Sequence, residues 1–288
     1  MQRRCQVWAV LNVTPDSFSD GGRFLDPAAA VARAAEYVAG GADVIDVGGA
    51  SSRPPGKAYG EGAEIVSVEE ELRRVVPVIE RIVAELRARV SIDTTRPEVA
   101  RAALRAGASI VNDVSNGSSD ALLEAAAEAQ AELVLMHNRG DGSVSGANIA
   151  YRDVVEDVVA ELSAAAVRAR CAGVPSKQIW IDPGVGFAKT AADSLAMIAA
   201  VPQLARTGYR VLVGPSRKSF IGVVEANANV VPQSGPLDRV GGTAAAVAFS
   251  VLGGAEAVRV HDLQIMRQAG LVTDALQLEA ARRRGQRG

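Results

Sequence analysis

The sequence predicts an α/β fold, a single (β/α)8 TIM barrel, and three observations support this prediction. Eight short apolar runs recur along the 288 residues, with helical patterns between them. The runs are continuous and rich in Val and Ile, which is typical of parallel strands buried on both faces. Nearly every run ends on a polar residue, and the strand ends of such a barrel converge on one active-site mouth. We therefore expect residues 1–288 to form one catalytic domain.

The expected strands recur along the whole chain. The apolar runs occupy residues 6–13, 43–49, 89–94, 109–115, 132–138, 178–184, 210–216 and 257–262. The polar residues at their ends are Asn12, Asp46, Asp93, Asn112, His137, Asp182, the Ser216-Arg217-Lys218 run, and Arg259 with His261. Residues that merely stop strands would be mostly Gly, Asn and Ser, whereas these include carboxylates, cations and both histidines of the chain. The pattern therefore favours a functional site.

The helices expected between the strands have apolar residues three and four positions apart. They cover residues 27–39, 68–86, 97–106, 120–129, 151–171, 192–205, 238–252 and 263–284. Several begin after Pro and end near Gly, as the helix between Pro97 and Gly107 does. The connections 51–66 and 223–236 are long, and long loops inside a compact domain are usually functional or mobile. The second is also compatible with plain surface.

The composition favours an enzyme that acts on small metabolites. A formal charge of -2 and a pI of about 5.8 predict no binding to nucleic acid or to an acidic membrane surface. The apolar runs are too short to cross a bilayer, and the first is too short for a signal peptide. Cys5 and Cys171 lie far apart without a nearby His at metal-ligand spacing, so we expect both to be packing residues. These features predict a cytoplasmic protein.

Eight segments carry recognisable motifs, and they follow one another in a fixed order. The segments are NVTPDSFSDGG at 12–22, DVGGASSRP at 46–54, SIDTT at 91–95, VNDVS at 111–115, MHNRG at 136–140, IDPGVGFAKT at 181–190, GPSRKSFIG at 214–222 and RVHD at 259–262. By these motifs the chain resembles the dihydropteroate synthases, the folate-pathway enzymes that sulfonamides target. The resemblance covers nearly the whole chain. It implies a homodimer of pterin-binding TIM barrels.

The activity that the resemblance implies is the condensation of 6-hydroxymethyl-7,8-dihydropterin diphosphate with p-aminobenzoate. The products are 7,8-dihydropteroate and pyrophosphate, and Mg²⁺ is bound. The residues that it assigns to the pterin are Asp93, Asn112, Met136, Asp182, Phe187 and Lys218. A pterin presents a ring N–H beside an exocyclic amine, and the carboxylate of Asp182 can accept both hydrogens. Asp93 and Asn112 can bond the remaining ring nitrogens, and Lys218 can donate to the other edge.

Purely structural roles for the same residues stay open at this point. Asp93 can cap the helix that begins near Pro97, and Asn112 and Asp182 can cap loops, because Asp and Asn are common there. For an isolated histidine such as His261, a satisfied core position is the alternative.

The diphosphate leaves as a multiply charged anion, so stabilising an anion is the main catalytic demand. Arg259 and His261 alternate along the last expected strand and therefore point to the same side. The diphosphate-binding residues that the resemblance implies are Asn12, Ser52, Arg53, Arg259 and His261. It gives Asn12 to the Mg²⁺ ion, which usually keeps several waters and substrate oxygens as ligands. Its catalytic group is Asp93, Lys218, Arg259 and His261.

p-Aminobenzoate needs apolar walls for its ring and a positive group for its carboxylate. The residues that fit are Phe18, Ser52, Pro54, Phe187, Arg217, Lys218 and Ser219. Arg217 can equally be a solvated neighbour of Lys218. The amine attacks the carbon itself, so no enzyme nucleophile is required. The segment GFAKT at 186–190 lacks the full spacing of a phosphate loop, and we expect its Lys189 to face solvent.

The chain departs from the family pattern at several positions. Ala50 stands where the family usually has Glu, Ser52 where it usually has Thr, and Asn138 where Met is common. The segment 55–64, PGKAYGEGAE, lengthens the connection beside the p-aminobenzoate pocket, and we predict that it alters sulfonamide sensitivity.

Two other functions compete with the synthase. A pterin-dependent methyltransferase that delivers methyl groups to a corrinoid would share the Asp and Asn pocket, but the segments 216–219 and 259–261 favour the synthase. A non-catalytic pterin-binding paralogue is kept open by Ala50 and the long loop.

Overall fold

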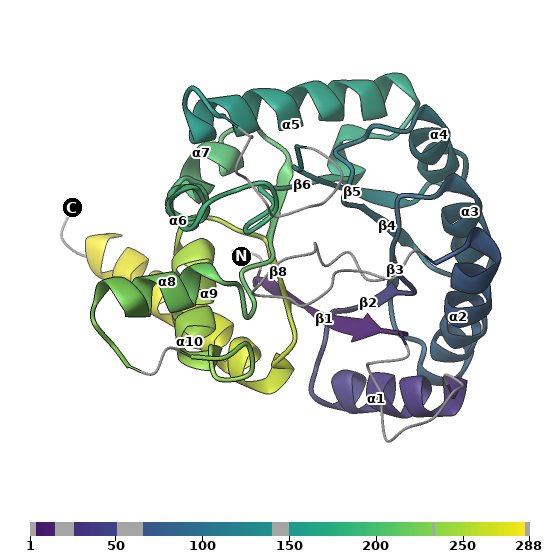
Figure 1. Ribbon diagram of the computed structural model, residues 1–288, viewed down its shortest axis with the longest axis horizontal. Coiled ribbons are helices and arrows are strands. Elements are labelled where there is room, and N and C mark those ends of the chain that lie inside the picture. Colours follow the sequence, from purple (N-terminus) through teal and green to yellow (C-terminus); the bar gives the residue numbers. More distant parts are fainter. Residues whose placement is uncertain (1–3, 15–25, 51–65, 140–149, 232–233, 286–288) are drawn as a thin grey trace.

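The computed structural model describes residues 4–14, 26–50, 66–139, 150–231 and 234–285. Its eight strands form a closed barrel in chain order, and every neighbouring pair is parallel. The strands are β1 (Gln6–Asn12), β2 (Val44–Gly48), β3 (Val90–Asp93), β4 (Ile110–Asp113), β5 (Glu132–Met136), β6 (Ile179–Asp182), β7 (Arg210–Val213) and β8 (Ala257–Val260). The helices surround these strands as an outer ring (Figure 1). The predicted (β/α)8 TIM barrel is confirmed.

The helices follow the expected order along the chain. They are α1 (Pro27–Ala39), α2 (Val68–Arg81), α3 (Pro97–Arg105), α4 (Asp120–Glu128), α5 (Val154–Cys171), α6 (Ala191–Ala199), α7 (Val201–Ala205), α8 (Phe220–Asn227), α9 (Val240–Leu252) and α10 (Leu263–Gly285). A π-helical turn, Ile82–Leu86, extends α2, and a short 3-10 turn, Ser176–Gln178, precedes β6. α1 begins and ends at the predicted residues. Its start is fixed by Asp26, which caps the first turn, and by Pro27, which is well placed there.

Three predicted elements differ from the structure. The helix expected over 192–205 is two helices, since Pro202 cannot continue the hydrogen bonding of α6 and stands instead in the first turn of α7. The connection expected over 223–236 begins within α8, so its first residues are helical. α5 begins only at Val154, because Asp153 accepts hydrogen bonds from the first free N–H groups and caps the helix there.

The barrel interior is layered because side chains alternate along each strand. Its lower layer is an apolar cluster that we call the floor, made of Trp8, Val44, Ile110, Val134, Trp180, Leu212 and Ala257. The rings of Trp8 and Trp180 meet edge to face with centroids 5.2 Å apart. Beneath Trp180, the guanidinium of Arg210 stacks at 3.5 Å, and Glu132 accepts the indole N–H at 2.6 Å.

The polar layer of the barrel lies directly above the floor. Two residues after a floor residue comes a polar one, so Val44 leads to Asp46, Ile110 to Asn112, Trp180 to Asp182 and Ala257 to Arg259. The period of two therefore turns all four polar side chains into the barrel, and Asp93 of β3, which bonds Arg259, completes this polar layer. The floor supports them from below.

The two cysteines differ in their surroundings. Cys5 is buried, as expected of a packing residue, but Cys171 is exposed at the end of α5, so the prediction for Cys171 is wrong. Among the described helices, none is long and apolar enough to span a membrane.

Candidate active site

Arg259 lies at the centre of the polar layer. Its Nε donates to Asp46 Oδ2 at 2.5 Å, and its Nη2 donates to Asp93 Oδ2 at 2.7 Å. Asn112 Nδ2 donates to the same oxygen of Asp46 at 3.2 Å. β2, β3, β4 and β8 thus each contribute one side chain to a connected network. The alternative role of Asp93 as a helix cap is wrong, because Arg96 holds the N-cap position of α3.

Two buried carboxylates share this one guanidinium. Asp46 is fully buried, and Asp93 is 8% exposed. Burial raises the pKa of Asp93 to about 7, although Arg259 lowers it and Asp46 adds repulsion. Burial alone would lower the pKa of Arg259, but Asp46 and Asp93 outweigh that effect and raise it, so the guanidinium stays charged. Asp93 can therefore take up a proton near neutral pH.

Asp182 ends β6 beside Met136 of β5. Its Oδ1 accepts a hydrogen bond from Gly184 N at 2.7 Å, so the loop-capping role does hold for this oxygen. A Cβ at Gly214 would stand 3.8 Å from Oδ2, and glycine there leaves that side of the carboxylate uncrowded. Burial raises the pKa of Asp182 to about 6, against the hydrogen bond from Gly184 and the charges of Lys218 and Arg259. At pH 7 most of this residue is a carboxylate.

The loop between β6 and α6 carries Phe187 against Lys218. The ammonium nitrogen lies 4.0 Å from the ring centroid, which is a cation–π contact. Gly184 has a φ of +65°, and a Cβ on it would lie 2.0 Å from the carbonyl oxygen of His137, so only glycine fits there. The loop thus passes close to β5 and brings Phe187 and Lys218 to the rim that holds Asp182.

His261 follows β8 and turns toward β7. Its Nδ1 lies 3.0 Å from Ser216 Oγ, whereas Arg259 turns toward the carboxylates of the polar layer. Burial lowers the pKa of His261 to about 3, and the charges of Arg259, Arg217 and Lys218 lower it further, so the imidazole is neutral at pH 7. Arg217 donates to Asp262 at 2.9 Å and 2.5 Å. Its side chain is therefore paired with Asp262, and its part in binding p-aminobenzoate stays a prediction.

Lys189 is buried, so its expected exposure to solvent is wrong. Only 4% of the residue is exposed, and its Nζ lies 2.8 Å from His137 Nδ1. Its ammonium lies beside His137, directly after β5, and 5.9 Å from the ring of Tyr151, before α5, and sequence proximity does not reveal these neighbours. Asp46 has a role that the sequence did not predict. The sequence showed only that it follows an apolar run, and the structure pairs it with Arg259.

The other predicted site residues lie at the same end of the barrel or outside the described residues. Met136 is buried at the end of β5, and Asn12 and Ser219 are half-buried at the end of β1 and before α8. Phe18, Ser52, Arg53 and Pro54 lie outside the described residues, as does the segment 55–64.

Asn12, at the end of β1, is the residue that the resemblance assigns to Mg²⁺. A Cβ at Gly48 would stand 3.7 Å from Asn12 Oδ1, so glycine there keeps the space beside this oxygen open. Within the described ranges, no group of three His, Cys, Asp or Glu residues is placed to hold a metal ion. An amide oxygen on its own fits an ion that takes most of its ligands from water and substrate phosphates, as Mg²⁺ does.

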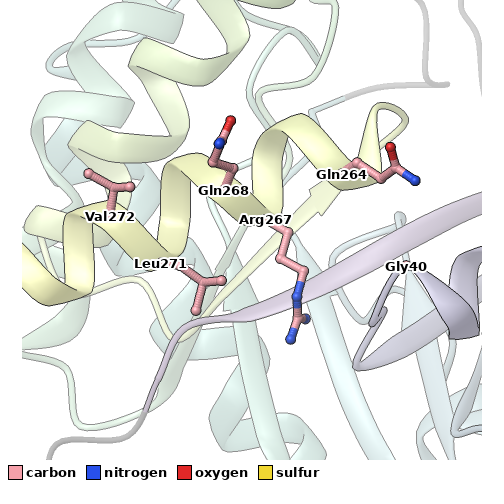
Figure 2. A pocket seen from close by; sticks show the side chains of 6 residues that line it. All are labelled: Gly40, Gln264, Arg267, Gln268, Leu271 and Val272. Carbon is pink, nitrogen blue, oxygen red and sulfur yellow. The ribbon is translucent and has the colours of Figure 1, made fainter.

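A groove also lies on the outer wall of the barrel, away from these residues (Figure 2). It has a volume of about 480 Å³ and is lined by Gly40, Gln264, Arg267, Gln268, Leu271 and Val272. Arg267 reaches from α10 toward the end of α1 and donates to the carbonyl of Gly41. None of the predicted site residues lines this groove, so the candidate site stays at the barrel mouth.

Comparison with known proteins places the chain in a family. A family model described as "Pterin binding enzyme" matches residues 8–261. The dihydropteroate synthase of Synechocystis sp. is 45% identical over 275 residues, which are 95% of this chain and 91% of that protein. The structure of Xanthomonas albilineans dihydropteroate synthase with 4-aminobenzoic acid has 42% identity and a TM-score of 0.85, over 95% of this chain and 93% of that one. The same enzyme with 7,8-dihydropteroate has 39% identity and a TM-score of 0.82, over 95% and 94%. The chain therefore belongs to the pterin-binding enzyme family, among the dihydropteroate synthases.

Proposed function

We infer that this protein condenses 6-hydroxymethyl-7,8-dihydropterin diphosphate with p-aminobenzoate, forming 7,8-dihydropteroate and pyrophosphate in folate biosynthesis. The observation that carries this inference is the polar layer, in which buried carboxylates and cations face one rim. A flat heterocycle with donor groups along one edge and a charged arm matches such a set. A barrel whose site served only a neutral ligand would not need this concentration of buried charge.

The pterin binds against Asp182, Asp93 and Asn112. Asp182 is the acceptor for the ring N–H and the exocyclic amine, because it is ionised at pH 7 and one oxygen is already fixed by Gly184. Asn112 supplies an amide that is oriented by Asp46. Lys218, held near the ring of Phe187, donates to the other edge of the heterocycle.

The diphosphate is bound by Arg259 and His261. In the described structure Arg259 is neutralised by Asp46 and Asp93, so the incoming anion competes with Asp93 for Nη2 while Asp46 keeps Nε. His261 is neutral and can donate a ring N–H to a phosphate oxygen. A bound diphosphate would offset the cations that lower the pKa of His261 and would raise that pKa.

The reaction needs charge stabilisation and positioning. As the C–O bond to the diphosphate breaks, its electron pair leaves with the pyrophosphate. The amine nitrogen of p-aminobenzoate forms the new C–N bond, and the amine then loses one proton. Arg259 and His261 stabilise the departing charge, which is where preorganised donors contribute most. Asn12 would hold a Mg²⁺ ion, which would supply further charge neutralisation for the departing pyrophosphate.

The direct test is to incubate the purified protein with the pterin diphosphate and p-aminobenzoate and to follow pyrophosphate release. Release that depends on both substrates, and that EDTA abolishes and added Mg²⁺ restores, is the expected result. Pyrophosphate release without p-aminobenzoate, or no release at all, would contradict the proposal. Activity that survives EDTA would contradict only the role of Mg²⁺. Methyl transfer to a corrinoid in a parallel assay would instead indicate the methyltransferase.

We also propose that two copies associate through α9 and α10. Exposed apolar side chains repeat along one stripe of α9, at Ala245, Phe249 and Leu252, and along α10, at Ile265, Val272 and Leu276. The two helices pack against each other beside α8 on one side of the barrel (Figure 1). An apolar surface of this kind on adjacent helices is typical of a protein interface, and a second copy would cover it.

A further inference from the structure

We propose that Lys189 is a positioning residue of the pterin pocket, which fixes the loop between β6 and α6 and the carboxylate of Asp182 without touching the pterin. The inference deepens the proposed function and rests on it. Lysine is seldom buried unless its ammonium is paired, and Lys189 is buried, with only 4% of the residue exposed. Its amine therefore needs hydrogen-bond partners inside the fold.

Lys189 connects the loop to β5 and α5. Its Nζ lies 2.8 Å from His137 Nδ1 and donates to the carbonyl oxygen of Phe187 at 3.2 Å. On the other side of the ring, His137 Nε2 lies 2.9 Å from Glu161 Oε2. An ammonium has no acceptor to offer, so His137 Nδ1 accepts and the ring hydrogen is on Nε2, which donates to Glu161. A chain of polar contacts therefore runs from Glu161 of α5 through His137 to Lys189 of the loop.

The loop needs this support because its backbone is unusual. Gly184 has a φ of +65°, and Ala188, which has a Cβ, has a φ of +49° in the left-handed region. Such conformations persist only where surrounding contacts hold them. Lys189 bonds the carbonyl of Phe187, and Tyr151 Oη donates to the carbonyl of Ala188 at 2.9 Å. The two contacts hold the part of the loop that sets the Phe187 ring against Lys218.

Lys189 and Asp182 meet at Gly184: its N–H donates to Asp182 Oδ1 at 2.7 Å, and a Cβ on it would lie 3.6 Å from Lys189 Nζ. The cations that face the Asp182 carboxylate and lower its pKa are Lys218, Arg259 and Lys189. Burial lowers the pKa of Lys189 to about 7. The nearby carboxylates of Asp182, Glu161 and Asp193 raise this pKa, and the charge of Arg139 lowers it. His137 is held neutral, since burial and the Lys189 charge lower its pKa to about 4. Below pH 7, Lys189 is therefore mostly an ammonium that favours the ionised form of Asp182.

The sign of the effect follows from these charges. Removing the ammonium removes one influence that lowers the pKa of Asp182, so that pKa rises above its value of about 6. Asp182 then becomes protonated at a higher pH and loses one of its acceptor oxygens. The pH below which pterin binding weakens must move upward. A lysine that only filled space would not move this limit.

The test compares Lys189→Met, Lys189→Gln and Lys189→Arg with the wild type, and with Lys177→Met as a matched control at an exposed lysine. The dissociation constant of the pterin diphosphate is measured by calorimetry from acidic to alkaline pH, after circular dichroism has confirmed folding. Lys189→Gln keeps a hydrogen-bond donor and is the variant to rely on if Lys189→Met does not fold.

We expect both neutral variants to move the acidic limit of binding upward by about half a pH unit, less than the ~1 unit of an adjacent opposite charge, because Lys218 and Arg259 act on Asp182 more strongly than Lys189 does. Near pH 6 this makes binding about twofold weaker. Lys189→Arg, which keeps the charge, and Lys177→Met should keep the wild-type limit. An unmoved limit in Lys189→Gln, or an equal shift in Lys189→Arg, would overturn the inference. Wild-type protein that binds no pterin at any pH would instead contradict the proposed function.

Discussion

Replacing Asp46 with Asn tests the network on which the anion site depends. Asp46 is fully buried, and its Oδ2 accepts from Arg259 Nε at 2.5 Å and from Asn112 at 3.2 Å. The amide has the same shape, but it removes one of the two negative charges that hold Arg259. Removing one partner of a buried ion pair usually costs about 3–5 kcal/mol. Since Arg259 keeps Asp93 at 2.7 Å, we expect the lower part of that range, about 3 kcal/mol.

This loss is measured by urea unfolding followed through tryptophan fluorescence, since Trp8 and Trp180 lie in the floor. About 3 kcal/mol corresponds to a fall in Tm of about 5 °C for a domain of 288 residues. Asp46 also raises the pKa of Asp93, so in Asp46→Asn the pKa of Asp93 should fall below about 7. Glu124→Gln on the exposed face of α4 is the control. An unchanged unfolding free energy together with an unchanged pH profile of pterin binding would refute the role given to Asp46.

The other predictions concern binding, turnover, assembly and inhibition. Asp182→Asn replaces one acceptor oxygen with a donor, so pterin binding should weaken about 30-fold, from ~2 kcal/mol for a charged hydrogen bond, and a wild-type Kd in calorimetry would refute its assignment. Arg259→Ala should lower kcat by about 100-fold through poorer stabilisation of the leaving diphosphate, with Arg259→Lys less affected; unaltered turnover would mean that another cation stabilises it. Phe249→Glu places a charge in the apolar stripe of α9 and should yield monomers in analytical ultracentrifugation, while a persistent dimer would rule out that surface. Removing residues 57–62 should change both the p-aminobenzoate KM and inhibition by sulfamethoxazole; if neither changes, the long loop has no part in that pocket.

The sequence predicted the barrel and the positions of most polar side chains because both follow from local patterns. Buried parallel strands have continuous apolar runs, and a period of two places every second residue inside. Asp182 and Arg259 could therefore be assigned to the mouth from their place after an apolar run. The start of α1 also follows from a local pattern, since Asp26 and Pro27 specify its first turn.

The partners of these side chains could not be predicted in the same way. Asp46 and Arg259 are 213 residues apart in the sequence and meet only because the barrel closes. Lys189 precedes Thr190, the cap of α6, and a lysine at such a position is usually exposed. It is buried here beside His137 and Tyr151, which lie far from it in the sequence, so its burial is a tertiary effect. The break between α6 and α7 was predictable in principle from Pro202, whose ring is incompatible with a continuous helix.

The floor of the barrel has a consequence for the route of the ligands. Trp8 and Trp180 fill the lower end, and Arg210 and Glu132 cover Trp180 from outside. In the described part of the barrel, passage from below is blocked, so ligands arrive and depart over the rim. The open end of the barrel is therefore both entrance and exit for whatever binds at the polar layer, and a substitution that opened the floor would be expected to admit water rather than ligand.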